Sequence, residues 1–183
     1  MATNLKVILW PSNKLEEGFI MNNKQENISI DQVGQANRTD AQNKIYNACI
    51  SYPVSKVLQV FGKSSLRQMR LLCLDKQYYT VTKSMWDQVI LSIASNHLIY
   101  ETDRFDCDKF ATYFAAMCAF DYGINSAGMV LDYQGRHAYN ALLVAPDKNG
   151  IDPVVMVLEP QTDQYVLKPD AHHTETSGTI IFN

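Results

Sequence analysis

Long apolar runs are absent from this sequence, and their absence shapes the first expectations about where the chain works. The apolar stretch nearest the start, "VILW", ends at Pro11 and falls short of a signal peptide's apolar segment, which spans about 7–15 residues. A membrane-spanning helix would need roughly 20 apolar residues. We therefore expect no membrane partner, and a chain that stays in a reducing cytoplasm or is released without a classical signal peptide.

Paired cysteines and concentrated positive charge are also missing. The cysteines form no CxxC pair, which argues against a thiolate metal site or a disulfide framework and predicts four free thiols, Cys49, Cys73, Cys107 and Cys118. The net charge is −3 and the Lys and Arg residues are scattered, so nucleic acid is not an expected partner. With 46% hydrophobic and 19% charged residues, the composition is that of an ordinary globular protein.

The first part of the chain, residues 1–81, is predicted to be mostly helical. One short strand, "KVILW", precedes a polar segment over residues 20–38 that we expect on the surface. Thr39 and Gln42 then stand at capping-box spacing, and apolar residues recur at helical intervals in "PVSKVLQVF" and "SLRQMRLLCL". Another amphipathic helix, in "TVTKSMWDQVILSIASNHL", is bounded by Thr82.

The second part, residues 82–183, changes from helix to strand. A helix over 107–121 ends before Gly123, and three strand-like runs follow: "AGMVLDY", "HAYNALLVA" and "PVVMVLEPQT". Two further runs, "QYVLK" and "GTIIF", suit edge strands. This order predicts an α+β fold in a single domain, residues 1–183, with amino-terminal helices packed on an antiparallel sheet.

Cys107 differs from the other cysteines because it stands at the predicted start of a helix. Phe110, Phe114 and Met117 recur behind it at helical spacing, so the helix begins close to the thiol. The unpaired N–H groups of a helix amino terminus stabilise a thiolate, and so does a nearby imidazolium. This placement favours Cys107 as a nucleophile, whereas the other thiols match the core positions that free cysteines usually take.

An imidazole and a carboxylate are placed to join this thiol. His137 opens a strand directly after a tight turn and is the best placed of the four histidines, with a purely structural histidine as the alternative. Glu159 ends the apolar run "VVMVL". If the two strands are antiparallel neighbours, Glu159 lies beside His137 and can orient its ring. His172 and His173 lie in a polar loop without an apolar pattern and are set aside.

Acidic residues flank Cys107 and suggest a cation site. Asp106 and Asp108 suit the first turn of a helix, where Asp106 can serve as the cap, yet two carboxylates oppose the ionisation of a thiol between them. A hard ion such as calcium would remove that conflict. The candidate ligands are Asp108, Asp106 and Asp103, with Gln161 or Asn140 as further oxygen donors.

Three segments, "DCDKFATYFAA", "GRHAYNALLV" and "VLEPQT", resemble the papain-like cysteine protease domain of the fungal chimerolectins related to fairy-ring mushroom agglutinin, their carboxy-terminal domain. The resemblance covers about residues 82–166 and leaves 1–81 unmatched. It implies a papain-like catalytic core over 82–183 and calcium dependence, with Lys109 standing where the family motif has a second aspartate. The nucleophile, base and orienting residue that it implies are Cys107, His137 and Glu159.

The activity implied by this resemblance is cysteine hydrolysis of an amide bond, in a polypeptide or peptide-like substrate, through a thioester. The oxyanion would need a donor besides the Cys107 backbone N–H. Candidates for contact with the substrate or the oxyanion are Asn96, Gln161 and Asn140. Two alternatives stay open: an NlpC/P60-like endopeptidase or transglutaminase-like acyltransferase with the same triad, and a catalytically inactive binding or inhibitor protein on the same fold.

Overall fold

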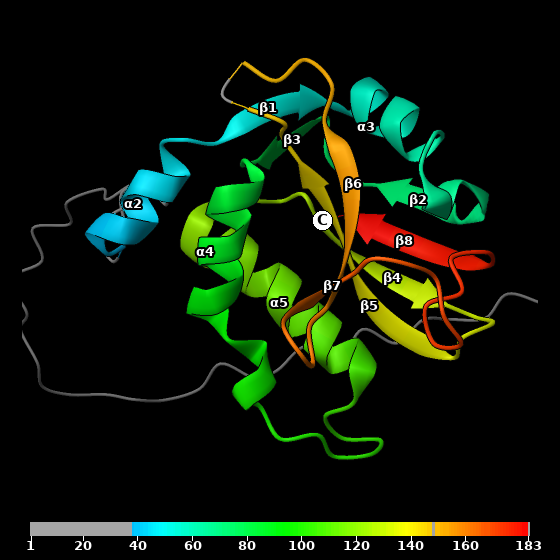
Figure 1. The fold of residues 1–183 in the computed structure, drawn as a ribbon. Helices are drawn as coiled ribbons and strands as arrows, with labels where there is room; N and C mark the ends of the chain where they lie inside the picture. The colour runs from blue at the N-terminus through cyan, green and yellow to red at the C-terminus, as the bar shows by residue number, and fades with distance from the viewer. Residues whose placement is uncertain (1–37, 148, 183) are drawn as a thin grey trace, which may run out of the picture.

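A six-stranded mixed sheet organises the protein in a computed structural model that describes residues 38–147 and 149–182 (Figure 1). The strand order is β2–β8–β4–β5–β6–β7. The strands are β2 (Arg70–Cys73), β8 (Gly178–Phe182), β4 (Ala127–Asp132), β5 (His137–Val144), β6 (Val154–Glu159) and β7 (Gln164–Val166). A separate two-stranded sheet pairs β1 (Ile50–Pro53) with β3 (Gln77–Thr80).

Strand β5 lies inside the sheet, and all its residues after His137 are buried. Its side chains alternate between two hydrophobic clusters, as the period of a strand requires. Tyr139, Ala141 and Leu143 belong to one cluster, whereas Leu142 and Val144 belong to the other. Burial on both faces explains why the sequence of this strand is almost continuously apolar.

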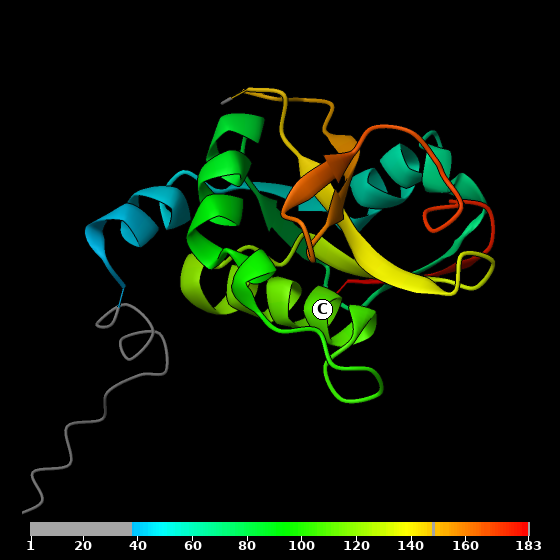
Figure 2. The same cartoon turned by 60° about the horizontal axis from the view of Figure 1, so that its bottom comes forward.

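Helices cover both faces of the sheet. Helices α4 (Lys83–Ile93) and α5 (Cys107–Tyr122) lie on one face, and α3 (Val54–Phe61) lies on the other (Figure 1, Figure 2). The remaining helical segments are α2 (Asp40–Tyr46) and the 3-10 helices η1 (Ser65–Gln68) and η2 (Ser95–His97). None of the helices in the described part of the chain has the length and apolar character needed to cross a bilayer.

Most of the predicted elements are present. The capping box of Thr39 and Gln42 is confirmed, as are the helix that ends at Gly123, where φ is +66°, and the three predicted strands that became β4, β5 and β6. The α+β class is therefore confirmed. The single-domain organisation stays a prediction. The strand predicted in "KVILW" and residues 20–37 of the predicted surface segment lie outside the described residues.

Three expectations about the sheet and the first part of the chain were wrong. The run "SLRQMRLLCL" forms η1 and β2 instead of a helix, because β2 pairs with β8. That pairing is parallel, so the sheet is mixed and not antiparallel throughout. Strand β8 lies between β2 and β4, so of the two strands predicted at edges only β7 is at an edge.

Asp132, at the end of β4, ties the loop that precedes β8 to the sheet. Its side chain is buried and accepts hydrogen bonds from the backbone N–H groups of Gly135 at 2.9 Å, Thr174 at 2.7 Å and Glu175 at 3.1 Å. The Thr174 hydroxyl adds a bond of 2.7 Å. Burial alone would raise the pKa of Asp132, but these hydrogen bonds outweigh it and hold the pKa below its ordinary value of 3.8.

We expect Asp132→Asn to lower the free energy of unfolding at pH 7 by about 1–3 kcal/mol, since it leaves buried donors without a full acceptor. Because the folded pKa is depressed, the carboxylate stabilises the protein above pH 4, and this contribution is lost as the pH falls through the folded value. The difference in the free energy of unfolding between wild type and variant, measured by urea denaturation, should therefore be smaller at pH 3 than at pH 7. Exposed Glu101→Gln is the control, and a difference that is unchanged at pH 3 would contradict this account.

Candidate functional site

The antiparallel pairing of β5 with β6 brings His137 and Glu159 together, as predicted. The register pairs Asn140 with Leu158, and its continuation puts Tyr139 opposite Glu159 and His137 diagonal to it on the same face. The His137 Nε2 and Glu159 Oε2 atoms are 2.6 Å apart. Both side chains are only 13% exposed, so this contact is largely screened from water.

His173, which was not expected to take part in a site, completes the group. Its Nε2 lies 3.0 Å from the same Glu159 Oε2, and its Nδ1 lies 3.0 Å from Asp170 Oδ1. We call His137, Glu159 and His173 the imidazole–carboxylate cluster. The signal that could have revealed it is Asp170, whose carboxylate accepts from the backbone N–H groups of His172 and His173 in a local turn.

The electrostatics of the imidazole–carboxylate cluster favour charge separation. Burial would raise the pKa of Glu159, but hydrogen bonds from His137, His173 and the Gln161 backbone outweigh it and bring that pKa to about 2. The hydrogen bond to Glu159 is the largest cause that raises the pKa of His173, with Asp170 adding to it against the opposing effect of burial. Glu159 is therefore anionic at neutral pH and attracts protons or other cations to the facing nitrogens.

Cys107 starts α5 as predicted, but the surroundings of its thiol differ from the expectation. Asp106 is the N-cap residue by its backbone, without a capping bond from its side chain. The Lys109 ammonium instead lies 3.3 Å from Asp106 and 2.9 Å from Asp108. Lys109 thus supplies a positive charge where a metal ion was predicted.

The thiol and the His137 imidazole are not joined by a hydrogen bond in the described structure. Helix α5 contributes Phe114 and Cys118 to one hydrophobic cluster, whereas the His137 ring lies beside Tyr139, which belongs to the cluster on the other face. The contact that His137 makes is with Glu159, the residue that was predicted to orient its ring.

The three predicted amides take different positions. Asn140 is fully buried, and its side-chain amide donates a hydrogen bond of 2.9 Å to the carbonyl oxygen of Ala111. This bond fastens α5 to β5. Gln161 approaches the imidazole–carboxylate cluster through its backbone N–H, which donates 3.0 Å to Glu159 Oε1. Asn96 is exposed, and its backbone N–H donates to Asp163.

Calcium binding by Asp103, Asp106 and Asp108 stays a prediction. Within the described residues, a group of three acidic, histidine or cysteine side chains close enough to share one ion is found at the imidazole–carboxylate cluster and not at these aspartates.

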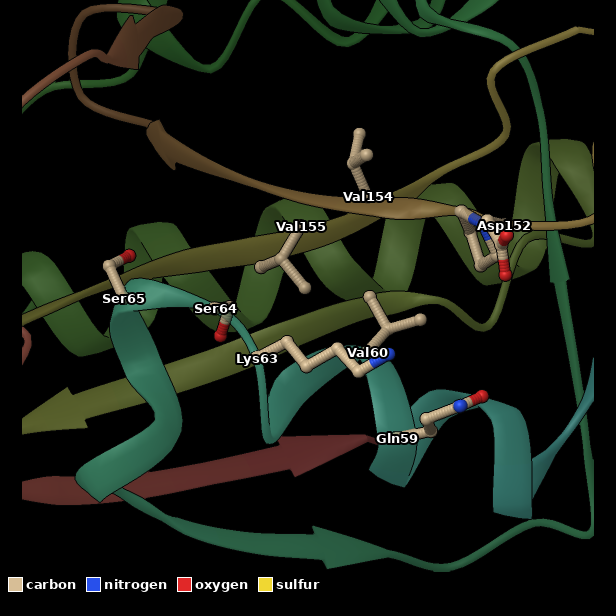
Figure 3. A pocket seen from close by; sticks show the side chains of 9 residues that line it. Gln59, Val60, Lys63, Ser64, Ser65, Asp152, Val154 and Val155 are labelled. Carbon is tan, nitrogen blue, oxygen red and sulfur yellow. The ribbon is translucent and has the colours of Figure 1, made fainter.

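A cavity of about 460 Å³ opens between α3, η1 and the start of β6, and we call it the α3–β6 cavity (Figure 3). Polar side chains such as Lys63 and Ser64 line it, and Val60 and Val155 supply apolar surface. Its volume falls in the range of about 300–1,000 Å³ that is typical of small-molecule sites. Its lining consists of Gln59, Val60, Lys63, Ser64, Ser65, Asp152, Pro153, Val154 and Val155.

No protein-family model matches this chain, and no curated protein matches it in sequence. Several solved chains are similar in fold, among them the following two. One is described as a PSL1a–E64 complex, with a TM-score of 0.52 and 19% identity over 72% of this chain and 51% of that chain. The other is the Polyporus squamosus lectin bound to the human-type influenza-binding epitope Neu5Aca2-6Galb1-4GlcNAc, with a TM-score of 0.51 and 21% identity over 72% of this chain and 49% of that chain.

These comparisons contradict the predicted family and activity. The neighbours are described as a lectin and a PSL1a complex, and neither description names a papain-like peptidase. The chimerolectin protease domain, the cysteine hydrolase with its peptide substrate and the alternative enzymes with the same triad were therefore wrong predictions. At this level of identity the likeness concerns the fold, and this chain spans about half the length of the two chains it resembles.

The four thiols should differ sharply in reactivity. Burial raises the pKa of Cys49 to about 11, raises that of Cys73, and raises that of fully buried Cys118 well above the ordinary value. Cys107 is only partly buried at a helix amino terminus. We expect iodoacetamide at pH 7.5 to modify Cys107 at least about tenfold faster than the others, as measured by peptide mass spectrometry. A fast phase that survives in Cys107→Ser would show that this assignment is wrong.

Proposed function

We propose that this protein is a carbohydrate-binding protein and that the α3–β6 cavity is its sugar site. The observation that carries the proposal is a ligand-sized cavity whose lining combines amide, hydroxyl, ammonium and carboxylate groups with valine surface. A sugar ring presents hydroxyl groups that need both donors and acceptors, together with C–H faces that pack on apolar side chains. The description of the Polyporus squamosus lectin as bound to a sialylated glycan supports the same class of ligand.

The charges around the α3–β6 cavity suit an acidic sugar. Lys56 binds Asp152 at 2.5 Å, and this hydrogen bond lowers the pKa of Asp152, so the carboxylate is an acceptor held in place at neutral pH. Ser64 donates its hydroxyl hydrogen to the Phe61 carbonyl at 2.8 Å, which leaves the oxygen lone pairs as acceptors. Lys63 contributes an ammonium that can bind the carboxylate of a sialic acid.

Titration with Neu5Aca2-6Galb1-4GlcNAc, followed by NMR chemical shifts, tests this proposal. We expect saturable shifts at residues that line the α3–β6 cavity. Lys63→Met should weaken binding by about tenfold or more, because it removes a charge-assisted hydrogen bond while roughly preserving side-chain length. Lys76→Met, which removes an exposed lysine outside the cavity, is the control and should bind like wild type.

The outcomes that contradict the sugar site are equally specific. The proposal is contradicted if the glycan shows no saturable binding, or if wild type and Lys63→Met bind the glycan with equal affinity. E64, the compound named for the other neighbour, is titrated in parallel. Binding of E64 at Cys107 without any binding of glycan would also contradict the proposal.

We further propose that the chain works in a reducing compartment such as the cytoplasm. The support is that all four cysteines are free thiols in the structure.

A further inference from the structure

We infer that the imidazole–carboxylate cluster is a binding site for a divalent transition-metal ion of the zinc type. This site is separate from the α3–β6 cavity and does not depend on the proposed sugar binding. One ligand atom each from His137, Glu159 and His173 lies within 4.8 Å of the other two. Two imidazoles and one carboxylate are a donor set that zinc and related ions prefer, whereas calcium prefers oxygen ligands alone.

The distances fit such an ion after a small adjustment. The Nε2 atoms of His137 and His173 lie 2.6 Å and 3.0 Å from Glu159 Oε2. Zinc–ligand bonds of about 2.0–2.2 Å in a tetrahedral arrangement separate neighbouring ligand atoms by about 3.3 Å. Moving each imidazole away from Glu159 by less than about 1 Å brings these two pairs to that separation, and the ligand atoms of all three side chains already lie within 4.8 Å of one another.

The hydrogen bond from His173 to Asp170 points the other ring nitrogen, Nε2, at Glu159. An ionised carboxylate can only accept, so the Nδ1–H of His173 donates to Asp170. When His173 is neutral, this bond places a lone pair on Nε2, opposite the anionic Oε2 of Glu159. Two acceptors facing each other require a proton or a metal ion between them. A carboxylate behind a metal-binding histidine is also the usual arrangement in metalloproteins.

The three side chains are held firmly enough to form a site in advance. The Gln161 backbone N–H fixes Glu159 Oε1 at 3.0 Å, which leaves Oε2 for the two imidazoles. The loop that carries His173 is fastened by Asp132 through Thr174, the next residue. The Tyr139 ring packs against His173, with ring centroids 4.9 Å apart. Three protein ligands leave a fourth tetrahedral position for water or a ligand atom.

Calorimetric titration of the tag-free full chain with ZnCl₂ tests this inference, and Co²⁺ absorption spectra report the geometry of the site. We expect one ion per chain, with visible bands typical of tetrahedral cobalt. His173→Gln should abolish binding at this site, and Asp170→Asn should weaken it by about 10–100-fold, since Asp170 acts through His173. His97→Gln, which removes an exposed imidazole from η2, is the control and should bind like wild type.

Each alternative outcome overturns the metal site. It fails if wild type binds no zinc, or if His173→Gln and Asp170→Asn bind as tightly as wild type. Thermal melting without metal checks that the variants are folded, and if His173→Gln does not fold, Asp170→Asn decides the question. Because glycan binding is measured at the α3–β6 cavity, failure of the sugar proposal leaves the zinc result unchanged.

Discussion

The antiparallel pairing of β5 with β6 is the constraint on which the rest of the structure depends. It holds β5 inside the sheet, where helices cover both faces and this single strand supplies side chains to both hydrophobic clusters. The same register places the end of β6 beside the start of β5, which puts Glu159 within hydrogen-bonding distance of His137. A shift of one residue would turn Glu159 to the other face and remove the contact.

The loop before β8 adds His173 to the imidazole–carboxylate cluster, which the pairing of β5 with β6 cannot supply. Asp132 draws the segment before β8 back to the turn between β4 and β5, and this brings His173 to Glu159. The two carboxylates thus have different tasks. Asp132 is saturated by backbone and hydroxyl donors and fixes the loop, whereas Glu159 faces two imidazoles and retains a chemistry that depends on proton or metal binding.

Local sequence patterns predicted much of this fold. Alternating or continuous apolar runs located β4, β5 and β6, and helical spacing with Gly123 as a terminator located α5. Strand β2 was missed because a short leucine-rich run suits a buried helix and a buried strand equally, and only its partner β8, about a hundred residues later, decides. His173 was missed for a similar reason, since a histidine in a polar loop has no periodic signal.

The predicted peptidase is contradicted by the comparisons, whose neighbours are described as a lectin and a PSL1a complex. The contact between His137 and Glu159 was predicted correctly. The place of Cys107 beside them rested on a helix start and a family resemblance, and it stays a prediction. In the structure, Lys109 neutralises the acids around the thiol, and the imidazole is bound to Glu159 and shares it with His173. The likeness to a Polyporus squamosus lectin concerns the fold, so function must be argued from the α3–β6 cavity and the imidazole–carboxylate cluster.

The most direct test of the account is ¹⁵N NMR of the histidine side chains in metal-free wild type and in Glu159→Gln. If one carboxylate oxygen serves both rings, the substitution should shift the Nε2 resonances of His137 and His173 together and leave those of His97 unchanged. If only one of the two rings responds, or neither does, the shared carboxylate at the centre of this account is contradicted.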